Sequence, residues 1–300
     1  MIIQMFNGWY FFWVVLCTVI TIDLYLLFKN KSEKSQDILL FSLLIVGIIL
    51  HFTKGFYPPY STDTARMLRD SWFVNFCGAN IALFPFMYFS KNNHIKDYMF
   101  YVGVLSGLIA ILYPEEPLAK IDQINEYLDI IRFYYHHWML LSVPLLRFLW
   151  GRHKLSYKRV LSAPTILMIV ALFIMLNQVL QSELGFIPLR GNNISYPNYK
   201  NSSYIWGPLT GTGVKTAIGD VLKIFTPDIF RTIPIGANKG QEKYWPWFWL
   251  ICPVYIIVGT YAFLVSLIQD RKTFVKDIKT LKTKIVCFAK GIKKKLFKSK

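Results

Sequence analysis

Apolar residues gather along the chain into seven long runs that polar loops separate. A helix needs about 20 consecutive apolar residues to cross the hydrocarbon core of a bilayer. We therefore predict an all-α, polytopic transmembrane helix bundle with about seven spans. The fourth run is short, and the second run ends near the charged residue Lys54, so a count of six spans stays open. The seven runs cover residues 8–28, 38–56, 71–89, 98–113, 130–150, 160–181 and 244–268.

The charges of the loops predict the direction of the spans. The loops after the first, third and fifth runs carry several Lys and Arg, whereas the loop that contains Glu115 and Glu116 is acidic. Short cytoplasmic loops of membrane proteins are enriched in Lys and Arg. We therefore predict a multi-pass protein of the cell membrane whose N-terminus lies outside and whose C-terminal segment lies in the cytoplasm.

Two segments lie outside the predicted spans of the bundle, which covers residues 1–270. The loop 182–243 is long enough to form an outer cap, and apolar residues at helical spacing from Val214 to Phe225 predict an amphipathic surface helix within it. The tail 271–300 has twelve Lys and Arg against one Asp, and apolar residues recur in it every three or four positions. This pattern suits a helix that lies on anionic inner-leaflet lipids or docks a cytoplasmic protein partner. The candidate contact residues of the tail are Lys272, Lys279, Lys282, Lys293, Lys294 and Lys295.

Composition and charge support this organisation. Of the 300 residues, 54% are hydrophobic and 17% are charged, whereas about a quarter are charged in a typical soluble domain. The formal net charge is +17, but most of the excess lies in the tail, so no binding to nucleic acid is predicted. The four cysteines form neither a disulfide framework nor a metal-binding motif, and we predict no metal or cofactor.

Uncharged polar residues of different spans fall at one membrane depth. In the predicted directions Cys77 lies about 9 Å into the third span, and the histidine pair of the fifth span lies at a similar depth. Polar groups at this depth are costly, so each is expected to have a partner or a function. The pattern predicts a polar pocket that opens outward and is lined by His51, Asn75, Cys77, Asn80, His136, His137 and Asn177.

A cysteine beside a histidine is a candidate for nucleophilic catalysis. The imidazole takes the thiol proton, and the thiolate attacks a carbonyl carbon. Within a bilayer this pair would suit acyl transfer to or from a lipid ester. Composition alone favours a simpler interpretation, in which the cysteine is a small packing residue and the histidines bond to the backbone or reach the interface.

A family resemblance changes this balance. The segments "WFVNFCGANIALFPFMYF", "YVGVLSGLIAILYPE", "FYYHHWMLLSVPLLRF" and "EKYWPWFWL" resemble the YwaF-like family of bacterial integral membrane proteins. That family is distantly similar to eukaryotic transmembrane cysteine acyltransferases. The resemblance implies that Cys77 and one histidine of the fifth span, preferably His137, form the working pair. The family often has a histidine two residues before the cysteine, where this chain has Asn75, so a supporting group is missing from that position.

We therefore carry two hypotheses forward. In the first, the protein is a thiol-dependent lipid acyltransferase or hydrolase in which Cys77 is the nucleophile, His137 is the base, and Asn75 and Asn80 bind the oxyanion or orient the pair. In the second, it is a non-catalytic membrane subunit that anchors a cytoplasmic assembly through its basic tail. A transporter is a third interpretation, disfavoured because charges within the spans and paired broken helices are scarce.

Overall fold

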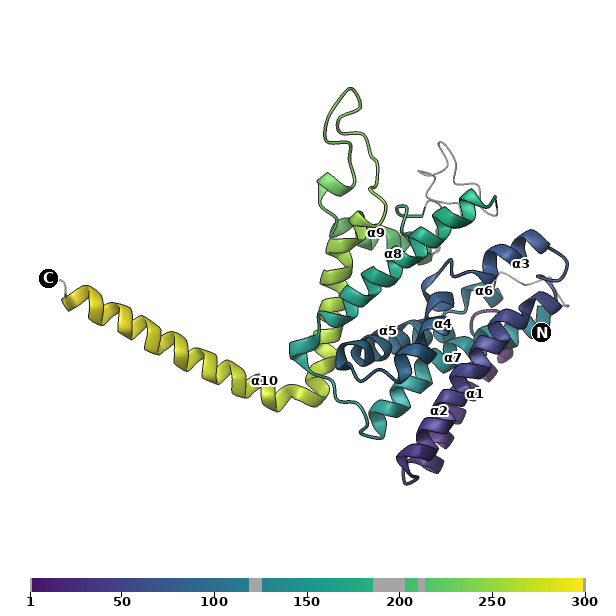
Figure 1. Cartoon of the computed structure of the whole chain (residues 1–300), viewed down its shortest axis with the longest axis horizontal. Coiled ribbons are helices and arrows are strands. Elements are labelled where there is room, and N and C mark those ends of the chain that lie inside the picture. The colour runs from purple at the N-terminus through teal and green to yellow at the C-terminus, as the bar shows by residue number, and fades with distance from the viewer. Residues whose placement is uncertain (1, 119–125, 186–202, 210–213, 299–300) are drawn as a thin grey trace.

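The computed structural model describes residues 2–118, 126–185, 203–209 and 214–298 (Figure 1). Within these ranges the regular structure is helical, and the only β-type pairing is one isolated antiparallel bridge between Thr232 and Glu242. The predicted all-α class is therefore confirmed for the described part of the chain.

Seven helices correspond to the seven predicted apolar runs. They are α1 (Gly8–Phe28), α2 (Glu33–Thr53), α4 (Phe76–Tyr88), α5 (Asn93–Leu112), α7 (Tyr127–Leu149), α8 (Ser162–Glu183) and α10 (Ile251–Lys298). Three shorter helices lie between them, namely α3 (Thr64–Ser71), α6 (Glu115–Leu118) and α9 (Val214–Ile224). Helix α9 occupies the position of the predicted amphipathic cap helix.

Five of the described helices are long and apolar enough to cross a membrane, namely α1, α2, α5, α8 and the first part of α10. Helix α4 is apolar but has only 13 residues. Helix α7 has 23 residues but carries Asp129, Arg132 and Arg147, and it is not among the five. The chain is therefore a multi-pass membrane protein, while the full count of seven spans stays a prediction.

Of these seven helices only α1 keeps the bounds of its predicted run, and for α4 and α10 the backbone gives the reason for the difference. The run 71–89 becomes helical only at Phe76, because Asn75 has extended backbone angles and caps α4. Helix α5, which corresponds to the run 98–113, begins five residues earlier than predicted, at Asn93. The run 244–268 becomes α-helical only at Ile251, because Trp247 has a φ of 66°, which an α-helix does not allow.

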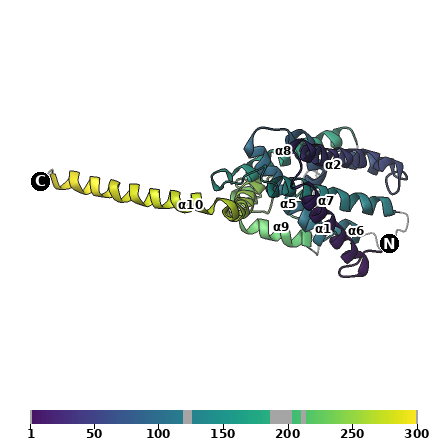
Figure 2. The same ribbon diagram turned by 90° about the horizontal axis from the view of Figure 1, so that it is seen from below.

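Helix α10 continues from the bundle into the tail without interruption (Figures 1 and 2). Its first part packs against α8, and its second part leaves the bundle in both views. The loop before α8 holds α10 at the point where α10 leaves the bundle. The Ser156 hydroxyl donates to Asp270 over 2.8 Å, the Tyr157 hydroxyl donates to Asp277 over 2.6 Å, and Lys158 lies 2.5 Å from the same Asp277 carboxylate.

Helices α5 and α7 make the most extensive contact among the described elements, and two glycines of α5 allow it. A Cβ added to Gly103 would lie 2.6 Å from the Leu140 carbonyl oxygen, and one added to Gly107 would lie 2.4 Å from the His137 carbonyl oxygen. Small residues four apart let membrane helices approach until their backbones touch. The position of α7, and with it that of His137, therefore depends on these two glycines.

We expect Gly107→Ala to destabilise the bundle, because the new methyl group would force the backbones of α5 and α7 apart. Such overpacking typically costs about 1–3 kcal/mol. The matched control is Gly259→Ala in α10, where the new Cβ would meet only the Leu161 side chain, at 4.0 Å. Thermal unfolding of the purified proteins in detergent tests this. Equal midpoints for the two variants would show that the contact does not need a glycine.

Candidate functional site

A cavity of about 580 Å³ lies where α2 and α5 end and where α4 begins beside the first half of α7. Ligand-binding cavities typically measure about 300–1,000 Å³. One part of its wall is polar and charged, and another part is apolar and includes Ile81, Ile109 and Ile218. Its Cys, His and Asn lining residues are His51, Asn75, Cys77, His136 and His137. Five of the seven predicted pocket residues therefore line one cavity.

The other two predicted pocket residues lie elsewhere. Asn80 is fully buried and accepts a hydrogen bond from the Tyr98 hydroxyl over 2.7 Å, so it faces α5 and does not line the cavity. Asn177 donates to the Phe73 carbonyl over 3.2 Å, which ties α8 to the segment before α4. Asn80 lies between the lining residues Gly78 and Ile81 but points to another face of α4, and the sequence could not show which face of each helix the cavity uses.

Cys77 lies in the first turn of α4, which Asn75 caps. The Asn75 Oδ1 accepts the Gly78 backbone N–H over 2.7 Å, and the Asn75 carbonyl accepts the Ala79 N–H over 3.0 Å. The first backbone N–H groups of a helix have no partner within the helix, and the helix dipole there favours negative charge. The N–H groups of Phe76 and Cys77 are in this position. The start of α4 therefore offers backbone donors to an oxyanion bound beside Cys77.

The hydrogen bonds of His137 define which of its nitrogens can act as a base. Its Nδ1 lies 2.8 Å from the Phe133 carbonyl oxygen. A carbonyl can only accept, so Nδ1 carries the hydrogen and the neutral ring has its lone pair on Nε2. Nε2 makes no hydrogen bond in the described structure, and the side chain lines the cavity. His137 is thus in the tautomer that can accept a proton from a group in the cavity.

His136 is held differently, although it is the next residue. Its Nε2 donates to the Gly47 carbonyl over 3.0 Å, and its Nδ1 accepts from Arg132 over 3.3 Å. Both nitrogens are therefore engaged, and the side chain is only 1% exposed. His136 ties α7 to α2 and is not placed to act as a base.

His51 has one engaged nitrogen. Its Nε2 donates to the Ser71 carbonyl over 3.2 Å, while its buried Nδ1 has no partner. The ring stacks on Phe73 and lies 6.1 Å from the His136 ring, between centroids. His51 therefore fixes the segment that leads into α4.

A charged group at the polar end of the cavity was not predicted from the sequence. Arg132 forms an ion pair with Asp129 and contacts Glu116 over 3.6 Å, and its guanidinium lies 5.7 Å from the centre of the Tyr60 ring. Lys54 donates to the Asp70 carbonyl, and its amino group lies 5.1 Å from the same ring. Burial raises the pKa of Tyr60, so its hydroxyl stays protonated at neutral pH.

A signal for Arg132 was present in the sequence, because it precedes His136 by four residues, which is one helical turn. For Lys54 the sequence indicates only the end of the second apolar run. In the described part of the chain no group of three or more His, Cys, Asp or Glu side chains is placed to hold a metal ion.

The described helices and this cavity define the class of the protein: a polytopic helical membrane protein with a cysteine- and histidine-lined cavity. A family model described as the TMEM164 family matches residues 4–212, which is more than half of the chain and includes Cys77 and both histidines of α7. The chain belongs to the TMEM164 family, a transmembrane family. Comparisons with curated proteins and with solved structures give no match. The narrower resemblance to bacterial YwaF-like proteins stays a prediction.

The two neighbouring histidines should differ in their effect on stability. We expect His136→Leu to lower the free energy of unfolding by about 1–3 kcal/mol, because it removes the hydrogen bond that joins α7 to the Gly47 carbonyl of α2 and leaves a buried Arg132 N–H without its partner. His137→Leu should change stability much less, since the Phe133 carbonyl keeps its bond within the helix. Thermal unfolding of both variants measures this. A larger loss for His137→Leu would contradict the assignment.

Proposed function

We propose that the protein is a thiol-dependent lipid acyltransferase or hydrolase of the cell membrane. The observation that carries the proposal is the shared cavity: Cys77 at a helix N-terminus and His137 with a free Nε2 line the same space. The mixed wall supports a lipid substrate, because an amphiphile has a polar group for one end of the cavity and an apolar chain for the other.

The reaction begins with proton transfer from the Cys77 thiol to His137 Nε2. The thiolate sulfur forms a bond to the carbonyl carbon of a lipid ester, and the carbonyl electrons move to the oxygen. The backbone N–H groups of Phe76 and Cys77 stabilise that oxyanion. When the ester C–O bond breaks, the His137 imidazolium protonates the leaving alcohol. A second alcohol, or water, then gives its proton to His137 Nε2 and attacks the thioester carbonyl carbon. The C–S bond breaks, the new ester or free acid leaves, and the sulfur takes the proton back from His137.

Asn75 contributes to this scheme in two ways. Its Oδ1 caps α4, so its amide NH₂ is the part of the side chain that can donate toward the cavity. Asn80 faces Tyr98 and does not line the cavity, so Asn75 is the asparagine that we assign to the oxyanion. The histidine that the resemblance expects at this position is replaced by a residue that holds Cys77 in the first helical turn.

Membrane orientation follows from the loop charges rather than from the cavity. With seven spans and the N-terminus outside, the cavity lies in the outer half of the membrane, and α9 with Val214 and Ile218 covers its outer side. The acyl donor and the acceptor would then reach Cys77 from the outer leaflet.

The proposal predicts an acyl adduct on Cys77. We expect intact mass spectrometry of gently purified protein to show a hydroxylamine-labile adduct that Cys77→Ser abolishes and Cys17→Ser leaves in place. His137→Gln should slow formation of the adduct about 10²–10⁴-fold, the usual contribution of a general base. Cys17 is a suitable control because it is buried in α1, away from the cavity. An adduct that persists in Cys77→Ser would contradict the assignment.

A second function is supported by the tail, namely anchoring or docking through the basic end of α10. The side chains of Ile278, Leu281, Ile285 and Phe288 are all exposed. They lie on one face of a helix whose other faces carry Lys272, Lys279 and Lys282, none of which has an ion pair in the described structure. Lys293, Lys294 and Lys295 lie on the same helix, but their side chains fall outside the described part. This stripe lies either on anionic lipid or on a cytoplasmic protein partner.

Hydrogen exchange in nanodiscs distinguishes whether the apolar stripe of the tail lies on anionic lipid or on a protein partner. If the tail lies on the membrane, amides of residues 278–298 should exchange roughly tenfold more slowly in phosphatidylglycerol discs than in phosphatidylcholine discs, because lysines are attracted to anionic headgroups. Leu281→Lys with Ile285→Lys should remove the difference. Equal exchange in both lipids would leave the stripe free for a protein partner and would contradict the lipid interpretation.

A further inference from the structure

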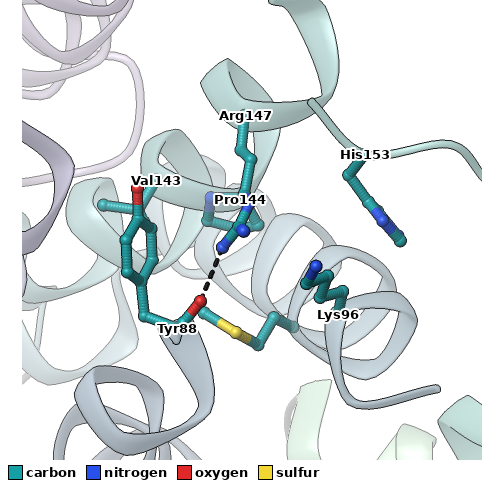
Figure 3. A pocket seen from close by; sticks show the side chains of 7 residues that line it. Tyr88, Lys96, Val143, Pro144, Arg147 and His153 are labelled. Atoms are coloured by element: carbon teal, nitrogen blue, oxygen red, sulfur yellow. Dashed lines mark hydrogen bonds between the residues drawn. The ribbon is translucent and has the colours of Figure 1, made fainter. Parts of the chain in front are cut away.

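A second, smaller pocket lies at the opposite end of the bundle from the cysteine cavity. It is formed where α4 ends, α5 begins and α7 ends, and its lining includes Tyr88, Lys96, Pro144, Arg147 and His153 (Figure 3). In Figure 3 the side chains of Lys96 and His153 lie on one side of Arg147, and Tyr88 lies on the other. The pocket shares no lining residue with the larger cavity.

Arg147 has no carboxylate partner in the described structure. One of its terminal nitrogens donates to the Tyr88 carbonyl over 2.7 Å, and its guanidinium lies 4.6 Å from the centre of the Tyr88 ring. Its Nε is buried and has no hydrogen-bond partner. A cation held in this way retains a strong capacity to bind an anion, because a buried donor without a partner is costly.

The nearby acids are already engaged by other cations. Asp37 accepts from the Tyr88 hydroxyl over 2.5 Å and pairs with Arg152 over 2.8 Å. Asp97, which is fully buried, is shared between His153 and Arg159, at 2.8 and 2.7 Å.

Lys96 also has no ion pair within the part of the chain that the structure describes. It lies within electrostatic range of Arg147 and Arg152, with Asp37 as the carboxylate in that range. The pocket therefore carries an excess of positive charge that its own acids do not neutralise.

The surroundings of the pocket are those of a membrane surface. Phe86 and Phe89, on either side of Tyr88, are 80% and 63% exposed, as expected for aromatic residues that face lipid near the interface. The enclosed volume is about 10 Å³, room for about one water-sized group. One phosphate oxygen can enter this space while the rest of a headgroup stays outside, at the level of the interface.

We propose that this pocket binds the phosphate of an anionic phospholipid in the leaflet on this side of the membrane, with Arg147 and Lys96 as the binding residues. Basic pockets between membrane helices are known to suit anionic headgroups. Tyr88 holds the Arg147 guanidinium in place, and the exposed aromatic residues beside it contact the lipid chains. The site does not depend on the chemistry at Cys77.

Native mass spectrometry of the full chain in mild detergent tests the proposal, in a Cys77→Ser background so that acylation plays no part. Phosphatidylglycerol and phosphatidylethanolamine with identical acyl chains are added at matched concentrations. We expect phosphatidylglycerol to bind more tightly. Lys96→Gln should weaken its binding about fivefold, and Lys96→Gln with Arg147→Gln about twenty-fivefold.

The matched control is Lys31→Gln with Lys34→Gln, which removes two exposed charges near the start of α2 and leaves the pocket intact. It should leave the tightest phosphatidylglycerol site unchanged. Lys96→Gln alone keeps the test valid if Arg147→Gln does not fold. Equal binding of the two lipids, or loss of the tight site in the control variant only, would overturn the proposal. Displacement of phosphatidylglycerol by equimolar inorganic phosphate would also overturn it, because the pocket would then be a site for free phosphate.

Discussion

The approach of α5 and α7 at Gly103 and Gly107 is the contact on which the rest of the structure depends. The His137 carbonyl lies where a side chain of residue 107 would begin, so the backbones of the two helices are in direct contact. Close backbone approach of this kind stabilises helix pairs in a bilayer, where burial of apolar surface between helices gives little driving force. The same contact sets the height and rotation of α7, which carries Arg132, His136 and His137 into one layer of the bundle.

The two histidines of that layer illustrate how neighbouring residues acquire different roles. They project about 100° apart on the helix, so His136 meets the backbone of α2 and His137 meets the cavity. A bond from each ring to a backbone carbonyl then selects its tautomer. For His136 this leaves no free nitrogen, and for His137 it leaves Nε2 open. Positions that look equivalent in the sequence thus become a structural residue and a candidate base.

The two ends of the bundle also differ in their electrostatics. The end with the cysteine cavity mixes acids and bases around Tyr60, where Arg132 pairs with Asp129 and contacts Glu116. At the other end the carboxylates of Asp37 and Asp97 are each shared by more than one donor, and neither Lys96 nor Arg147 has an ion pair within the described residues. This excess of positive charge is on the side that carries the basic loops and the basic end of α10.

The sequence by itself determined the helical class, the membrane environment and the positions of most helices. Length and apolar composition decide whether a segment crosses a membrane, and both are local properties; α1 has the bounds that its apolar run predicts. The sequence also pointed to Cys77 and the histidine pair, because polar residues in apolar runs are conspicuous. It did not separate His136 from His137 by their hydrogen bonds, and it did not place Asn80 against Tyr98. Nor did it reveal Arg132 and Lys54 around Tyr60, or the unneutralised charge of Arg147.

Each of these features depends on which face of one helix meets another, and residues far apart in the chain decide that. The start of α4 at Asn75 and of α10 after Trp247 depends on backbone angles that apolar composition does not encode. Hydrophobic pattern therefore determined which segments are helices. The tertiary structure alone decided which side chains share a cavity, because that requires the rotation of every helix about its axis.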